Sequence, residues 1–201
     1  QVKPTKEIYD SELRIKLDDS QQPHSELLSF EADASKAENK IVENLEFKVK
    51  PQMMNISDDS TGKVEILYPD STIWYEGQVK DGEPDKLWRC YYESGNLKNS
   101  VLYENGKVVN NAVFYYDNQR NTIHIKVRFE DNKVVNDYRE YYQNGQLKAK
   151  IAYDDGKPDG KAQHYYPNGN LKMTGRYKEG ARTGKWEVYN AQGKLIREIK
   201  H

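Results

Sequence analysis

The residues able to do chemistry in this chain are few and widely spaced. They are one cysteine, Cys90, and four histidines, His24, His124, His164 and His201. A metal site needs His, Cys or carboxylate ligands close together, and a cysteine nucleophile needs a histidine beside it. Cys90 instead alternates with Trp88 in an apolar segment, which is typical of a small core residue. We therefore expect no catalytic residue, metal site or cofactor, and a protein that is not an enzyme.

Tyrosine is the residue type whose spacing indicates binding. Several of the 16 tyrosines occur as adjacent pairs. The first members of these pairs, together with Tyr189 at the same phase, form what we call the first tyrosine column: Tyr91, Tyr115, Tyr141, Tyr165 and Tyr189. The second members form the second tyrosine column: Tyr92, Tyr116, Tyr142 and Tyr166. Exposed tyrosine rings with polar tips suit a protein partner and can also stack on sugars, whereas cross-strand packing of the rings is the structural alternative.

Three lysines follow the tyrosine pairs at a constant distance. Lys98, Lys148 and Lys172 fall on the strand that we expect beside the first tyrosine column, where their alkyl stems can lie along the rings. The first tyrosine column and these three lysines form the candidate binding strip.

The tyrosine pairs belong to a repeat of about 24 residues. Glycines recur at two phases of this repeat, the first holding Gly95, Gly145 and Gly169 and the second Gly106, Gly156 and Gly180. Asn132 replaces a glycine in one copy, and Ser71 in another. Glycine and asparagine accept positive φ, so each repeat is expected to reverse direction twice. Between the reversals, apolar and polar residues alternate with period two, which predicts half-buried strands.

Each repeat therefore predicts one β-hairpin. The expected fold class is all-β: a single-layer antiparallel meander of about six stacked hairpins with an acidic N-terminal extension. Pairing Tyr92 with Leu97 would place Trp88 and Val101 on an apolar face, and the first tyrosine column on the opposite face. Beside the glycines and the second tyrosine column, the residues that shape the repeat are Leu97, Leu147, Leu171, Trp88 and Trp186.

Composition supports a thin fold. Only 36% of the 201 residues are hydrophobic, although 11% are aromatic, so the chain is too polar for a thick core and too aromatic for disorder. No apolar run approaches the roughly 20 residues that a membrane helix needs. The net charge of −1 does not favour a nucleic-acid partner.

The pattern of paired tyrosines, an Asn-Gly turn and Leu-Lys, as in Tyr142 to Lys148, resembles the MORN-type repeat in the variant found in the bacterial YwqK family. The resemblance covers residues 62–201. Members of that family are commonly labelled antitoxins. It implies a meandering sheet of stacked hairpins that serves as a scaffold or binding surface. The additional residues at Gln119 to Asn121 depart from the pattern.

Residues 1–60 differ from residues 61–201. They carry 8 Lys and Arg against 13 Asp and Glu, with no glycine. Short alternating stretches predict some strands, the spacing of Ile41, Val42 and Leu45 fits a helix over 35–45, and the segment near Gln1 is expected to be disordered. An uncovered apolar sheet face would be an interface, so we expect this acidic segment, or a second copy of the chain, to cover it.

Two functions fit the sequence. The first is a repeat scaffold for protein–protein interaction in the bacterial cell envelope, antitoxin-like in character. The alternative is a glycan-binding or cell-wall-binding module that uses the tyrosines. A start at Gln1 without methionine favours an exported protein, at the cell surface or in the periplasm, over a cytoplasmic one.

Overall fold

A computed structural model describes residues 6–9, 12–16 and 60–201. These residues fall into two compact units, one ending at Asn121 and the other beginning at Thr122. All regular secondary structure among them is β-strand. The described residues include no helix that is long and apolar enough to cross a membrane. The predicted helix over 35–45 and most of the predicted acidic cover lie outside the described residues.

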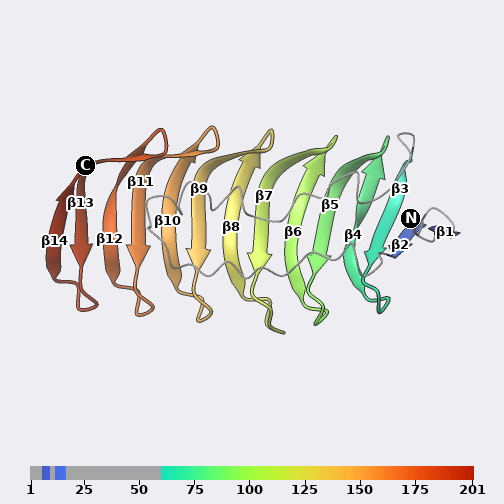
Figure 1. Ribbon diagram of the computed structural model, residues 1–201, viewed down its shortest axis with the longest axis horizontal. Helices are drawn as coiled ribbons and strands as arrows, with labels where there is room; N and C mark the ends of the chain where they lie inside the picture. The colour runs from blue at the N-terminus through green and yellow to red at the C-terminus, as the bar shows by residue number, and fades with distance from the viewer. Residues whose placement is uncertain (1–5, 10–11, 17–59) are drawn as a thin grey trace. The chain divides into compact units, whose positions relative to one another are not determined.

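The first unit contains seven strands. They are β1 (Lys6–Tyr9), β2 (Glu12–Lys16), β3 (Gly62–Leu67), β4 (Ile73–Lys80), β5 (Glu83–Tyr91), β6 (Leu97–Glu104) and β7 (Lys107–Tyr115). Within the unit they follow one another across the sheet in chain order (Figure 1). Neighbouring strands are antiparallel, except that β2 and β3 run parallel.

The second unit also contains seven strands. They are β8 (Ile123–Glu130), β9 (Lys133–Tyr141), β10 (Leu147–Asp154), β11 (Lys157–Tyr165), β12 (Leu171–Lys178), β13 (Ala181–Tyr189) and β14 (Leu195–Lys200). They again follow chain order, and every neighbouring pair is antiparallel. The predicted fold class, a single-layer meander of hairpin repeats, is confirmed.

The two predicted reversals of each repeat are two different turns. At the second glycine phase, Asn105 and Gly106 both have positive φ, 48° and 74°, as a two-residue type I′ turn requires. Asn132 adopts a φ of 65° at the same position, which an asparagine tolerates. At the first phase, the Gly95 amide donates to the Tyr92 carbonyl at 2.8 Å, and Gly95 has a φ of 81°. Ser71 occupies this position with a φ of 74°, so the substitution does not remove the turn.

The predicted pairing of Tyr92 with Leu97 is wrong. Leu97 pairs with Tyr91, and the register then shifts so that Cys90 lies opposite Asn99. The reason is the turn itself: the Tyr92 amide donates to the Asn96 carbonyl at 2.9 Å, so Tyr92 already belongs to the loop. The shift restores the expected pairing of Trp88 with Val101, which are both buried.

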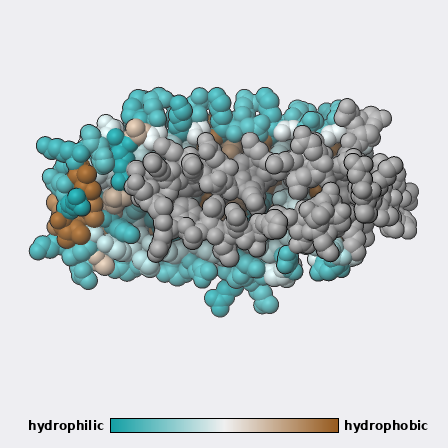
Figure 2. Space-filling model, viewed as in Figure 1, coloured by the Kyte–Doolittle hydropathy of each residue, from teal (hydrophilic) through white to brown (hydrophobic). Residues whose placement is uncertain are grey.

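One face of each sheet carries the buried residues, and we call it the inward face. In the first unit it includes Trp88 and Val101, and in the second Val127 and Trp186, each at most 1% exposed. The opposite, outward face carries the alternate residues of each strand. Figure 2 shows hydrophobic residues at the surface near β13 and β14, where Leu195 and Ile196 are 43% and 59% exposed.

The two inward tryptophans of this packing each lie against a glycine. A Cβ atom added to Gly77 would lie 2.2 Å from the Trp88 ring, and one added to Gly175 would lie 2.2 Å from the Trp186 ring. In another repeat the larger residue is on the other strand of the pair, because Ile151 of β10 lies opposite Ala162 of β11. In each of these three pairs a small residue leaves space for a larger one on the neighbouring strand, as close packing demands.

This size matching predicts that Gly175→Ile destabilises the protein by about 3 kcal/mol, because the added side chain would overlap the fully buried Trp186 ring. The double variant Gly175→Ile/Trp186→Ala recreates the Ile151 and Ala162 pair, and we expect it to be more stable than Gly175→Ile alone. Urea denaturation followed by circular dichroism measures both. A double variant less stable than the single one would contradict this account.

Candidate functional site

Cys90 and His201 both lie in packing positions. Cys90 is fully buried on the inward face, as the sequence predicted for a core residue. His201 lies edge-on to Trp186, with ring centroids 6.3 Å apart. Among the described residues no group of three or more His, Cys, Asp or Glu side chains could hold a metal ion. His24 lies outside the described residues.

The first tyrosine column lies on the outward face, because each of its residues is next to an inward position of its strand, as Tyr91 is next to Cys90. All five tyrosines are half-buried. The Tyr91 hydroxyl donates to Glu76 Oε1 at 2.6 Å, and the Tyr189 hydroxyl donates to Glu187 Oε2 at 2.8 Å. Burial and the Glu76 hydrogen bond raise the pKa of Tyr91 to about 12, so this hydroxyl stays protonated and remains a donor.

The second tyrosine column connects neighbouring repeats. Its hydroxyls donate to backbone carbonyls of the first column one repeat further on, at 2.8–2.9 Å: Tyr92 to Tyr115, Tyr142 to Tyr165, and Tyr166 to Tyr189. Tyr68 makes the same bond to Tyr91. Burial raises the pKa of Tyr92, which keeps the donor protonated. The sequence identified this column but did not show where its hydroxyls bond.

The three lysines of the candidate strip do not lie where we expected. Their ammonium groups lie over rings of the second tyrosine column: Lys98 over Tyr92, Lys148 over Tyr142 and Lys172 over Tyr166, at 5.7–5.9 Å. The register shift after Leu97 and Leu147 turns the lysines away from the first column. The lysine ammonium groups therefore contact the second column, whereas the sequence analysis expected the lysine stems beside the first column.

Glu140 lies at an inward position of β9, and the sequence did not reveal its role. Its side chain is only 15% exposed. Lys148 Nζ lies 2.6 Å from Glu140 Oε1, and His124 Nε2 lies 3.5 Å from the same atom. Burial acts to raise the pKa of Glu140, but the hydrogen bonds from His124 and Lys148 outweigh it, and the pKa is lowered. An acidic residue at an apolar position was the signal that could have predicted this pairing.

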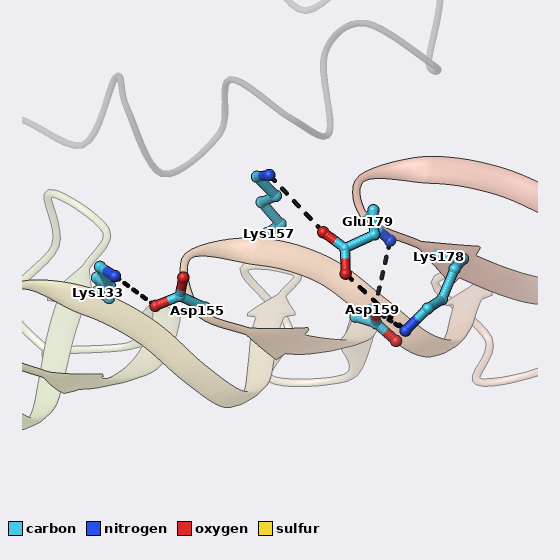
Figure 3. Close-up of polar contacts among 6 residues, drawn as sticks. All are labelled: Lys133, Asp155, Lys157, Asp159, Lys178 and Glu179. Atoms are coloured by element: carbon cyan, nitrogen blue, oxygen red, sulfur yellow. Dashed lines mark hydrogen bonds and ion pairs between the residues drawn. The ribbon is translucent and has the colours of Figure 1, made fainter.

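The type I′ turns are also linked from repeat to repeat. The Gly156 amide donates to the Val134 carbonyl at 2.9 Å, and the Gly180 amide donates to the Pro158 carbonyl at 2.8 Å. Figure 3 shows the ion pairs beside these bonds: Lys133 with Asp155, Lys157 with Glu179, and Lys178 with Asp159 and Glu179. Exposed ion pairs contribute little stability, so the backbone bonds are the main link at this edge.

The tyrosine hydroxyls provide a direct stability test. Tyr142→Phe should lower the free energy of unfolding by about 0.5–1.5 kcal/mol, because the Tyr165 carbonyl loses its donor. Tyr165→Phe is the matched control, since the Tyr165 hydroxyl makes no hydrogen bond to any described residue. Thermal denaturation of both variants measures the difference. Equal losses for the two variants would show that the hydroxyl bond does not stabilise the stacking.

The lowered pKa of Glu140 predicts a pH dependence. A carboxylate with a lowered folded-state pKa contributes stability above its unfolded pKa, near 4.3, and loses it as the pH falls through the folded pKa. Glu140→Gln should therefore lower stability by about 1–3 kcal/mol at neutral pH and reduce the loss between pH 5 and pH 2. The control is Glu104→Gln, at an exposed position. Identical pH profiles for wild type and Glu140→Gln would contradict the prediction.

Comparisons with known proteins identify the repeat. The family described as MORN repeat variant matches residues 84–105, 135–155 and 158–179, the first in the first unit and the others in the second. None of the curated proteins matches the chain.

Solved structures resemble the chain only weakly. A crystal structure of TarM is 15% identical over 83% of this chain and 26% of that chain, with a TM-score of 0.33. A glycosylation associate protein complex from Streptococcus agalactiae is 15% identical over 81% of this chain and 26% of that chain, with a TM-score of 0.25. The chain thus spans about a quarter of the length of these two chains. The three matched segments, which together make up less than half of the chain, are similar to the MORN repeat variant.

Proposed function

We propose that this protein is a non-catalytic scaffold of the bacterial cell envelope that binds a protein partner on its first tyrosine column. The MORN repeats support the scaffold part of this function. The antitoxin-like role that the sequence resemblance implies would be one form of such binding. Partner and location are both part of the proposal.

The observation that carries the proposal is the different use of the two tyrosine columns. The second column is committed to structure, because its hydroxyls bond to the next repeat and its rings contact the lysines. The first column receives those bonds on its backbone carbonyls, and its half-buried rings lie on the outward face. Two of its hydroxyls bond to carboxylates of the same face, Tyr91 to Glu76 and Tyr189 to Glu187. Rings that are fixed by a rigid sheet lose little conformational entropy when a partner binds, which favours them as anchors.

The test is a crosslinked affinity capture from envelope and cytoplasmic fractions of the native cell, read by mass spectrometry. Wild type should retain one stoichiometric protein, from the envelope fraction. The variant Tyr115→Ser/Tyr141→Ser/Tyr165→Ser should lose it, because three ring contacts are removed while the second column is intact. Circular dichroism checks that the variant is folded.

The matched control replaces three exposed turn or strand-end residues instead: Glu104→Ser/Gln143→Ser/Gln192→Ser. It should retain the partner as wild type does. Retention of the partner by the tyrosine variant would disprove binding by the first column. Polysaccharide retained by wild type without any protein, and lost by the tyrosine variant, would favour the glycan-binding alternative instead.

A further inference from the structure

The outward face of the second unit carries a concentration of positive charge. Six basic residues lie there on five successive strands, β8 to β12, and we call them the basic strip: Lys126, Arg128, Arg139, Lys150, Lys161 and Arg176. We infer that the basic strip binds an acidic polypeptide segment of the protein partner. This inference rests on the proposed scaffold function and specifies the chemistry of the partner.

Strand register places these cations directly beside one another. Arg139 pairs with Lys126 on one side and with Lys150 on the other, and Lys161 pairs with Arg176. Neighbouring strands are about 4.8 Å apart, well within the Debye length of about 8 Å at physiological salt. Like charges directly opposite each other destabilise a sheet. Packing of the inward face does not require this arrangement of cations.

The acidic residues of this face neutralise only part of the charge. Asp137 Oδ2 accepts from Arg139 at 2.9 Å and from Lys150 at 3.1 Å. Burial acts to raise the pKa of Asp137, but these two cations outweigh it and keep the pKa low. Nearer the type I′ turns, Glu130 pairs with Arg128 and Asp159 with Lys178.

Three cations of the strip remain without a carboxylate. Within the described part of the chain, Lys126, Lys161 and Arg176 form no ion pair. Lys161 and Arg176 are exposed and Lys126 is half-buried. A partner that supplies carboxylates at these positions would reduce the repulsion between the neighbouring cations, and the sheet would not have to change.

The first unit shows that the repeat does not require this charge. At its outward positions Leu87 pairs with Leu102, and Leu102 pairs with Val109. Glu76 lies opposite Arg89 and forms an ion pair with it at 3.3 Å. The positive charge is therefore a property of the second unit and not of the fold.

An acidic polypeptide fits the strip better than a nucleic acid. The whole chain has a net charge of −1, and a nucleic-acid protein normally carries a strong basic excess. Tyr141 and Tyr165 of the first column follow Arg139 and Gln163 on the same outward face. Carboxylates on an extended chain can thus meet the cations while apolar side chains contact the tyrosine rings.

The test measures the binding of fluorescent poly-L-glutamate to the full chain by anisotropy, at about 50 mM and about 300 mM NaCl. The variant Lys126→Glu/Lys161→Glu/Arg176→Glu reverses the three cations that form no ion pair. The matched control, Lys194→Glu/Arg197→Glu/Lys200→Glu, makes the same change in net charge at three exposed positions at and beside β14. We expect the strip variant to bind at least about tenfold more weakly than wild type, the control to bind within about twofold of wild type, and salt to weaken wild-type binding.

Equal losses in the two variants would reduce the effect to net charge and overturn the inference. Tighter wild-type binding to single-stranded DNA than to polyglutamate, lost in the strip variant, would overturn it in favour of a phosphate polymer.

The same variants are also used in the capture from native cell fractions. A partner retained by the strip variant overturns the basic strip and leaves the scaffold function intact. If no partner is captured but polyglutamate still binds through the basic strip, the result counts against the scaffold function and not against the basic strip.

Discussion

The structure depends on the hydrogen bonds that Tyr92, Tyr142 and Tyr166 of the second column donate to a backbone carbonyl of the next repeat. A hairpin in a single-layer sheet cannot bury its aromatic rings by itself, so each repeat needs its neighbours. The Tyr142 hydroxyl reaches the Tyr165 carbonyl at one edge, while the Gly156 amide reaches the Val134 carbonyl at the other. Both bonds join successive hairpins and fix their spacing. The inward rings, such as Tyr138 and Tyr153 with centroids 6.1 Å apart, then pack across that spacing.

These bonds also determine which residues remain available for binding. Because Tyr142 and Tyr166 use their hydroxyls for stacking and their ring faces for Lys148 and Lys172, a partner would have to displace structural contacts to use them. Tyr165 has no such commitment beyond its backbone carbonyl. A repeat with adjacent tyrosines can therefore use one ring for folding and leave the other for the proposed recognition, since the first tyrosine ends a strand and the second lies in the turn that follows.

The sequence predicted the elements that depend on local chemistry. The glycine phases located both turns, and alternation located the buried tryptophans, because positive φ and period two follow from residue type alone. It failed where one residue changed the register. The turn that begins at Tyr92 moved the pairing to Tyr91 and turned Lys98 toward the second column. Alternation placed Glu140 at an inward position but did not identify its partners, because its cations come from two other strands, β8 and β10.

Inward and outward positions of equivalent strands differ in how freely they vary. At the fifth position of β6, β8, β10 and β12 the inward residues are Val101, Val127, Ile151 and Gly175, and the first three are at most 1% exposed. At the next position the outward residues are Leu102, Arg128, Ala152 and Arg176. Packing restricts the first set and leaves the second free to change charge, since a solvated side chain costs the sheet little. Differences in binding between repeats are therefore expected at outward positions, where a change from leucine to arginine alters the partner that fits without altering the fold.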